Sequence, residues 1–218
     1  PNIMVVFGSG QYLVADDITT TGVQSFYGVW DHGVSSLTTS DLVEQTFETG
    51  SFFNDGSDVS SDFNVLTNNS VDYTSASPDD GWYIRLTQNS GERVIGDSDI
   101  VNDIVFFNTW IPESSLCSAG GSGFLMSVKL ETGGRPDGAV FDLNGDEKVD
   151  EKDLLDDGGT PANYYAATGQ RFTKGFPASS SFLSDNQYTP GTNGGATIEK
   201  RNIGSSSGMK RISWQELR

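Results

Sequence analysis

Short runs of apolar residues, separated by turn-forming residues, recur along the whole chain. Their length and their content of β-branched and aromatic residues are typical of β-strands. The longer runs are Ile3–Phe7, Gln24–Trp30, Val43–Phe47, Trp82–Leu86, Asp103–Ile111 and Phe124–Leu130, and the shorter ones are Ala139–Leu143, Ala196–Lys200 and Lys210–Trp214. Turn signals such as Asn54-Asp55-Gly56 and Gly133-Gly134 lie between them. The pattern predicts an all-β chain.

Helical periodicity is scarce. Leu42–Phe47 is compatible with one helical turn as well as with a strand, and Glu151–Leu155 is predicted to be a short helix. Residues 54–77 and 157–195 are polar and rich in Gly, Ser, Thr and Asn, so we expect long surface loops there.

The composition agrees with many short strands, since the 218 residues include 26 Gly, 13 Phe, 7 Tyr and 4 Trp. A Gly-Ser-Gly followed by a strand and a Thr/Gly turn occurs twice, after Gly8 and after Gly121. Such a recurring unit is typical of propeller blades. Two copies leave a β-propeller, a β-sandwich and other β folds open.

Acidic residues dominate the chain, with 30 Asp and Glu against 13 Lys and Arg and a net charge of −17. No Lys or Arg precedes Arg85. A surface of this sign repels phosphate backbones and anionic lipid, so we expect no nucleic-acid partner, and it favours bound cations. No apolar segment is long enough to span a membrane. Because the chain opens at Pro1 directly before a strand, we expect it to be an excerpt of a longer protein.

One segment combines oxygen-bearing side chains at a spacing that suits a metal ion. Residues 142–153 place Asp or Asn at loop positions 1, 3, 5, 9 and 12, and the backbone carbonyl at position 7 adds a further oxygen. The predicted ligands of this calcium-binding loop are Asp142, Asn144, Asp146, Lys148 (through its carbonyl), Asp150 and Asp153. Six acids and two lysines leave the twelve residues at −4, and this repulsion is expected to keep the loop open without a cation.

Calcium fits this loop better than other metals. It accepts six to eight oxygens at variable geometry, whereas magnesium requires a strict octahedron, and no His or Cys for zinc lies nearby. Two positions depart from the helix–loop–helix form of such loops, which has Gly at position 6 and Glu at position 12; here they are Glu147 and Asp153. The alternative is that Asp150 only caps the helix that follows it.

The remaining polar motifs do not indicate catalysis. The one histidine, His32, lies in a predicted turn, and the pairs Asp16-Asp17 and Asp79-Asp80 are typical of turns rather than of a glycosidase acid pair. Neither a phosphate-binding loop nor a dinucleotide fingerprint is present in the sequence. We therefore predict that the chain is not an enzyme. The single Cys117 pairs with a cysteine elsewhere or is a free thiol.

Motifs spread over nearly the whole chain match a known family. They are, in order, Val6–Leu13, Gln24–Asp31, Gly81–Leu86, Gly91–Val94, Ile111-Pro112, Cys117, Gly123–Met126, Thr132–Arg135, Phe141–Asp146 and Arg211–Leu217. In this order and spacing they resemble the C-terminal propeller domain of the PilY-type pilus assembly and tip adhesin proteins. Asn144 departs from the family's more usual Asp.

The resemblance implies a fold, a site and a setting. The fold is a modified propeller related to quinoprotein blades, of which residues 1–218 hold the last blades of one domain, and the calcium loop falls at Asp142–Asp150. The protein is expected to be secreted to the pilus tip on the surface of a Gram-negative bacterium. There it supports pilus assembly, extension and retraction (twitching) and adhesion, and its partners are the N-terminal remainder of the same protein, minor pilins and a host or abiotic surface.

A second interpretation assigns the loop to a calcium-dependent carbohydrate-binding or scaffolding module similar to a dockerin. Dockerins carry two such loops with flanking helices, and the sequence contains one.

Overall fold

The chain folds into stacked β-sheets, as the apolar pattern predicts. The computed structural model describes residues 3–11, 15–33, 36–113 and 121–203, and helical residues among them form only three short 3-10 turns, η1 (Ala15–Thr19), η2 (Thr39–Asp41) and η3 (Glu151–Asp153). The predicted strand at Lys210–Trp214 and Cys117 lie outside the described residues.

The first sheet is formed by the N-terminal part of the chain. Its strand order is β1 (Ile3–Gly8), β2 (Ser25–Asp31), β7 (Gly81–Arg85) and β3 (Val43–Gln45), with β3 parallel to β7 and the other pairs antiparallel.

The central sheet has six strands. Its order is β6 (Phe63–Asn64), β14 (Gly169–Phe172), β11 (Gly121–Lys129), β9 (Ile104–Asn108) and β8 (Asp99–Val101), with β10 (Ile111–Pro112) paired to β11.

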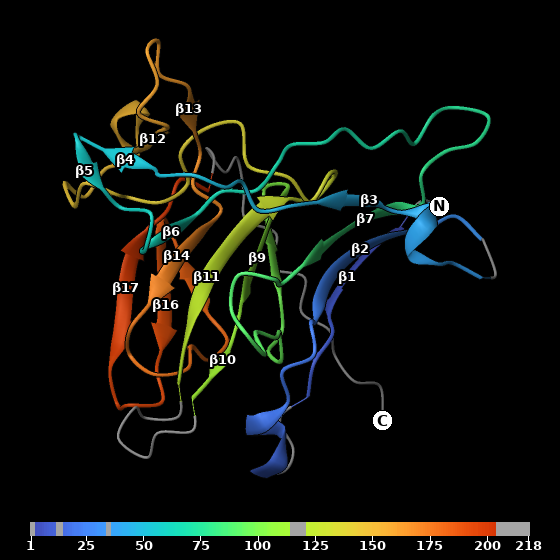
Figure 1. Ribbon diagram of the computed structural model, residues 1–218, viewed down its shortest axis with the longest axis horizontal. Coiled ribbons are helices and arrows are strands. Elements are labelled where there is room, and N and C mark those ends of the chain that lie inside the picture. Colours follow the sequence, from blue (N-terminus) through green and yellow to red (C-terminus); the bar gives the residue numbers. More distant parts are fainter. Residues whose placement is uncertain (1–2, 12–14, 34–35, 114–120, 204–218) are drawn as a thin grey trace.

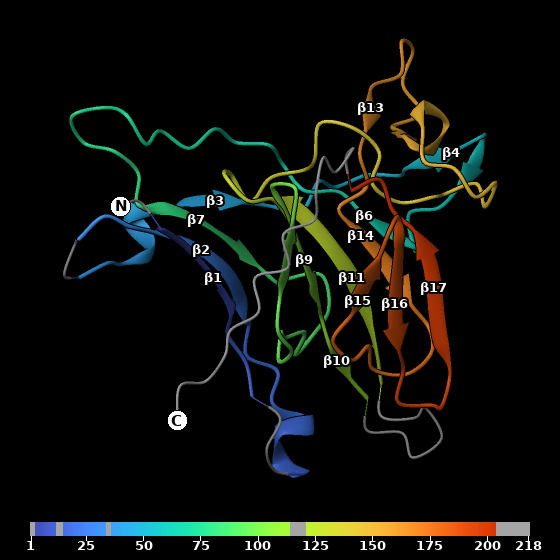
Figure 2. The ribbon, with the colours of Figure 1, turned by 180° about the vertical axis from the view of Figure 1, so that it is seen from behind.

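Two further sheets complete the described structure. The last sheet is β15 (Ser181–Leu183), β16 (Asn186–Pro190) and β17 (Ala196–Lys200), and the small sheet is β13 (Tyr164–Tyr165), β12 (Leu155–Asp156), β4 (Phe53–Asn54) and β5 (Ser57–Asp58). The first and last sheets lie on opposite sides of the central sheet, and the small sheet lies near one end of the stack (Figures 1 and 2).

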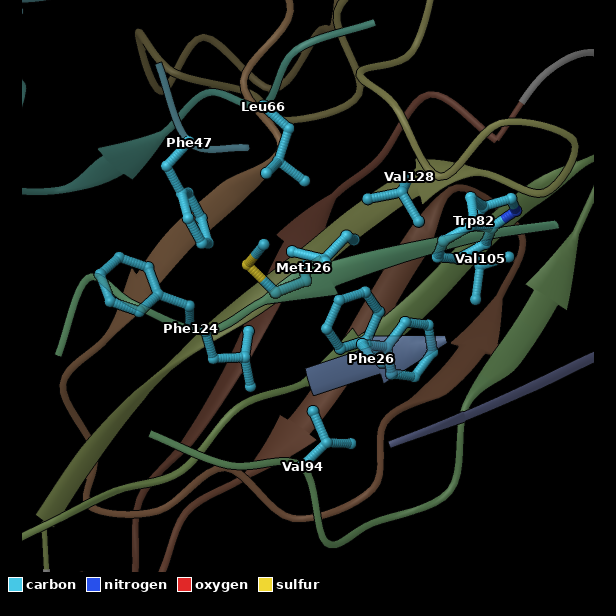
Figure 3. Packing of buried hydrophobic residues seen from close by; sticks show 12 residues of the cluster. Phe26, Phe47, Leu66, Trp82, Val94, Val105, Phe124, Met126 and Val128 are labelled. Carbon is cyan, nitrogen blue, oxygen red and sulfur yellow. The ribbon is translucent and has the colours of Figure 1, made fainter. Parts of the chain in front are cut away.

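The core between the first and central sheets is aromatic. Phe26 from β2 stacks on Phe107 from β9 with ring centroids 3.8 Å apart, beside the fully buried Trp82 from β7. Figure 3 shows Phe26 and Trp82 among the side chains of this core. Gly28 lies opposite Trp82 in the strand register, and a Cβ there would lie 2.3 Å from the indole ring. The glycine therefore makes room for the tryptophan.

A second core lies between the central and last sheets. Side chains that alternate along β9 and β11 point to it, and Phe106 contacts Phe182 of β15 at 4.7 Å between ring centroids. Because Val105 and Phe107 point to the first core and Phe106 to the second, both faces of the central sheet are buried.

Several predicted boundaries require correction. Residues 157–195 are not a surface loop, because they contain β13, β14, β15 and β16, and β14 is an inner strand of the central sheet. Residues 54–77 contain β5 and β6 and share β4, and only their later part lacks strands. The loop interpretation failed because the strands within 157–195 are short and carry many polar residues, so they lack the apolar pattern by which a strand is recognised.

Three shorter predictions are also corrected. The helix expected at Glu151–Leu155 is a 3-10 turn of three residues, after which Leu155 begins β12. Ala139–Leu143 forms no strand, but Phe141 makes an isolated bridge to Arg201. The run Asp103–Ile111 is divided between β9 and β10.

Candidate metal site

The predicted calcium loop is anchored to β-structure at both ends. Before the loop, Phe141 forms its bridge with Arg201, and the N–H of Asn202 donates to the carbonyl of Val140 at 3.0 Å. At its other end the loop finishes in η3, which leads into β12 of the small sheet. The loop therefore connects the last sheet to the small sheet.

Side-chain oxygens curl the first half of the loop. The two carboxylate oxygens of Asp142 accept the N–H groups of Gly145 (2.8 Å) and Glu147 (2.9 Å). Asn144 accepts the N–H of Asp146 at 2.9 Å, and Asp146 accepts the N–H of Lys148 at 3.0 Å. Each of these side chains folds back over the loop backbone, as a chain that curls around an ion requires.

The second half of the loop is closed by Asp153, which is fully buried. One of its oxygens accepts the N–H of Leu143 at 2.8 Å and that of Asn144 at 3.3 Å, and the other accepts the N–H of Asp150 at 2.9 Å. The carboxylate thus ties both ends of the loop together. These hydrogen bonds were not expected from the sequence, which indicated only a ligand at this position.

Asp150 caps η3, accepting the N–H of Lys152 at 2.9 Å. The capping role predicted as the alternative is therefore present. A cap uses lone pairs of one carboxylate and leaves the negative charge at the loop, so it is compatible with metal binding.

The backbone of the loop needs two residues in the left-handed region. Gly145 has φ 75° and Glu147 has φ 64°. Glu147 thus adopts the conformation that a glycine supplies in the helix–loop–helix form, at a cost of about 1 kcal/mol.

The donor chemistry fits a hard cation, because the side chains of the loop offer only oxygens. In the described part of the chain, however, no three or more Asp, Glu, His or Cys side chains are grouped closely enough to hold a metal ion. The carboxylates of the loop must therefore move toward one another before they coordinate one. The ligand set remains a prediction.

A buried arginine under the loop was missed by sequence reasoning. Arg201 is 1% exposed, and its guanidinium lies over the ring of Phe141, 4.4 Å from the ring centroid. Burial lowers its pKa to about 9, and the charges of Glu199 and Asp142 oppose this shift, so the side chain stays protonated at neutral pH. Its sequence position at the end of a strand gave no sign of burial.

The other polar motifs have structural partners. His32 stacks on Trp30, with ring centroids 4.0 Å apart, and its Nε2 lies 2.5 Å from an oxygen of Asp80. Asp79 accepts the N–H of Asp72 at 2.8 Å, and the buried Asp17 accepts a hydrogen bond from Gln11. His32 is therefore a hydrogen-bonded turn histidine, as expected. No helix among the described residues is long and apolar enough to cross a membrane.

Comparisons with known proteins show which proteins this chain is similar to. No family model matches the chain. Two curated proteins of Xylella fastidiosa, both named type IV pilus biogenesis factor PilY1 homolog, are 30% identical over 144 residues and 31% identical over 150 residues. The matches cover 63% and 64% of this chain but 9% and 11% of the relatives, so the chain spans about a tenth of their length.

A solved structure matches the fold more completely. The crystal structure of the Pseudomonas aeruginosa PilY1 C-terminal domain aligns with a TM-score of 0.73 and 22% identity, covering 92% of this chain and 42% of that domain. The curated relatives and the solved domain together confirm that the chain resembles the C-terminal domain of the PilY-type pilus proteins.

Proposed function

We propose that this chain is part of a calcium-binding, non-enzymatic component of the type IV pilus tip, exposed at the cell surface. The setting is supported by relatives that are named as pilus biogenesis factors and by the likeness to a PilY1 C-terminal domain. The observation that carries the calcium part is the curled, all-oxygen loop at 142–153 with a formal charge of −4.

The proposed mechanism is electrostatic. A divalent cation neutralises much of the charge of the loop, which draws Asp142, Asp146 and Asp150 toward one centre. Because the loop joins the last sheet to the small sheet, this closure fixes the two sheets relative to each other. The surface offered to minor pilins or to an adhesion target changes with it, which would bias pilus extension, retraction and attachment.

The propeller is part of the same proposal. Consecutive blades of a propeller are sheets packed face to face, so that a blade between two others is buried on both faces, as the central sheet is here. Both ends of the stack also present apolar outer faces, with Ile3, Val5 and Phe7 on β1 and Leu183 and Ile198 on the last sheet, each at least 45% exposed. Further sheets from the N-terminal remainder of the longer protein would cover them.

The dockerin-like alternative gains no support from the surroundings of the loop. Among the described residues, the loop ends in one 3-10 turn and is followed by a strand, where a dockerin has a helix.

Calcium titration of the melting temperature tests the proposal. Calcium at about 100 times its Kd stabilises a binding protein by about 2.7 kcal/mol, which raises Tm by about 5–10 °C for a chain of this size. The Asp150→Asn variant should lose most of this gain, because Asn retains the N-cap but not the charge. Asp58→Asn, in a similar turn that binds Ser60, is the control and should keep the full gain. Equal Tm values of the wild type with and without calcium exclude the proposal.

A further inference from the structure

Arg201 is a buried cation whose partners are all neutral. Its Nε donates to Oε1 of Gln187 at 2.7 Å, its Nη2 to Oε1 of Gln170 at 2.9 Å, and its Nη1 to the carbonyl of Lys200 at 2.9 Å. None of the ion pairs within the described residues involves it. Burying a guanidinium without a paired carboxylate costs free energy, so a counter-charge at longer range is needed.

Two carboxylates act on Arg201 at longer range, Glu199 of β17 as the larger contributor and Asp142 of the candidate metal loop as the second. The guanidinium lies over Phe141, the residue directly before Asp142, and Phe141 and Arg201 are also bridged through their backbones. A hollow of about 310 Å³ separates Glu147, Lys148 and Val149 of the loop from Arg201 and its neighbours in the last sheet. The arginine is therefore fixed beneath the acidic loop, close enough to act on its charges, without an ion pair to any one carboxylate.

We propose that Arg201 is a built-in counter-cation of the loop, which holds the loop in place when no metal is bound and weakens its affinity for calcium. The part that concerns calcium rests on the proposed function. Both effects have one cause: a fixed positive charge attracts Asp142 and its neighbours but repels an ion that enters among them. Since the charge is buried, salt screens it weakly.

Such a charge determines the calcium concentration at which the loop becomes occupied. A loop of charge −4 without a counter-cation would bind calcium tightly and stay occupied. With Arg201 beneath it, the loop should respond to calcium at the higher concentrations found outside cells, and remain partly folded when calcium is withdrawn.

Two substitutions separate the charge of Arg201 from its packing. Arg201→Gln removes the charge, and Arg201→Lys retains it while losing the planar fork that binds Gln170 and Gln187. Both should lower Tm in EDTA. In calorimetric titration, Arg201→Gln should bind calcium about tenfold more tightly than the wild type, at 0.1 M and at 0.5 M salt, whereas Arg201→Lys should remain within about twofold. An unchanged or weaker affinity of the Gln variant, or an equal change in the Lys variant, overturns the proposal.

A measurement without calcium distinguishes this inference from the proposed function. In EDTA, Asp142→Asn should lower Tm in both backgrounds, because Asn cannot accept both N–H groups that the carboxylate of Asp142 accepts. The loss should be smaller in the Arg201→Gln background, where the favourable interaction between the charge of Asp142 and the arginine is already absent. If the wild type binds no calcium but this coupling is present, the proposed function fails and the counter-cation role stands. Additive effects of the two substitutions in EDTA overturn the counter-cation role itself.

Discussion

The central sheet and the first sheet have strands of the same apolar character but are covered differently. In the central sheet, Phe106 and Phe107 are both buried, one against each neighbouring sheet. In the first sheet, β1 alternates, so that Met4 and Val6 face inward while Ile3, Val5 and Phe7 are about half exposed. Yet β1 reads as a continuous apolar run, which is the pattern of a strand covered on both faces.

The aromatic residues of the first sheet extend this contrast. On its outer face, Phe7 stacks on Tyr27, and Tyr27 on Tyr83, with ring centroids 5.2 Å and 6.1 Å apart across three strands. Such a row would be buried in a core, but here it faces outward. In the proposed propeller, a further sheet would cover this face, as neighbouring sheets cover both faces of the central sheet.

The largest effect is expected when a large side chain of the central sheet, which is buried on both faces, is replaced by alanine. Phe107→Ala removes a ring that is 2% exposed and stacked on Phe26, and should lower the free energy of unfolding by about 3–5 kcal/mol. Phe7→Ala removes the same group at 46% exposure and should cost less than about 1 kcal/mol in this chain. Denaturant unfolding measures both, and equal losses would contradict the difference in cover.

A somewhat smaller effect is expected when the glycine that faces the core between the first and central sheets is replaced by alanine. Gly28→Ala places a methyl group against the ring of Trp82, which is packed too tightly to move, and should cost about 1–3 kcal/mol. Gly138→Ala, where nothing lies within 4 Å, is the control and should be neutral. If Gly28→Ala is also neutral in thermal unfolding, Trp82 is able to shift and the inner face of the first sheet is loosely packed.

These comparisons show which parts of the fold could be predicted. Strands with apolar patterns, such as β1, β2, β9 and β11, were found to within a few residues, because burial on one or both faces fixes their composition. The strands within 157–195 were missed, since β14 contains Gly169, Gln170 and Arg171 and is recognisable only from the neighbours that it pairs with.

The candidate site also has features that could be predicted from the sequence and features that could not. The positions of Asp142, Asn144, Asp146 and Asp150 follow from a spacing that is local in sequence, so the loop could be found. Asp153 makes its backbone hydrogen bonds only in the closed form of the loop. Arg201 reaches its position under the loop through a bridge between segments that are distant in the chain. No local pattern carries that information.

The link between β7 of the first sheet and β8 of the central sheet contains a buried acid. Glu92 is fully buried and its Oε1 has no hydrogen-bond partner among the described residues, while its Oε2 accepts from Asn89. Burial raises the pKa of Glu92 above its usual 4.5, and polar contacts with Thr109 and Asn89 oppose only part of this rise.

The stabilising form of Glu92 is therefore the protonated one. Its contribution is complete below about pH 4.5 and is lost as the pH rises through the raised pKa. Glu92→Gln should consequently stabilise the protein at pH 7 by about 1–2 kcal/mol and have little effect at pH 4. Unfolding of both proteins between pH 4 and 8 measures this, with the exposed Glu131→Gln as the control. A difference that does not depend on pH would mean that Glu92 does not titrate in this range.

The smallest effect in this chain is expected on the open face of the first sheet, where a substitution tests directly whether a neighbour covers that face. Val5→Lys places a charge at a position that is 45% exposed, so the free energy of unfolding should change by less than about 0.5 kcal/mol. In a longer protein that covers this face, the same charge would be buried without a partner and should cost several kcal/mol. Val23→Lys, at 50% exposure outside the strands, should be neutral in both proteins. A small effect of Val5→Lys in both would mean that the face remains open, and that the continuous apolar run of β1 serves a purpose other than burial between sheets.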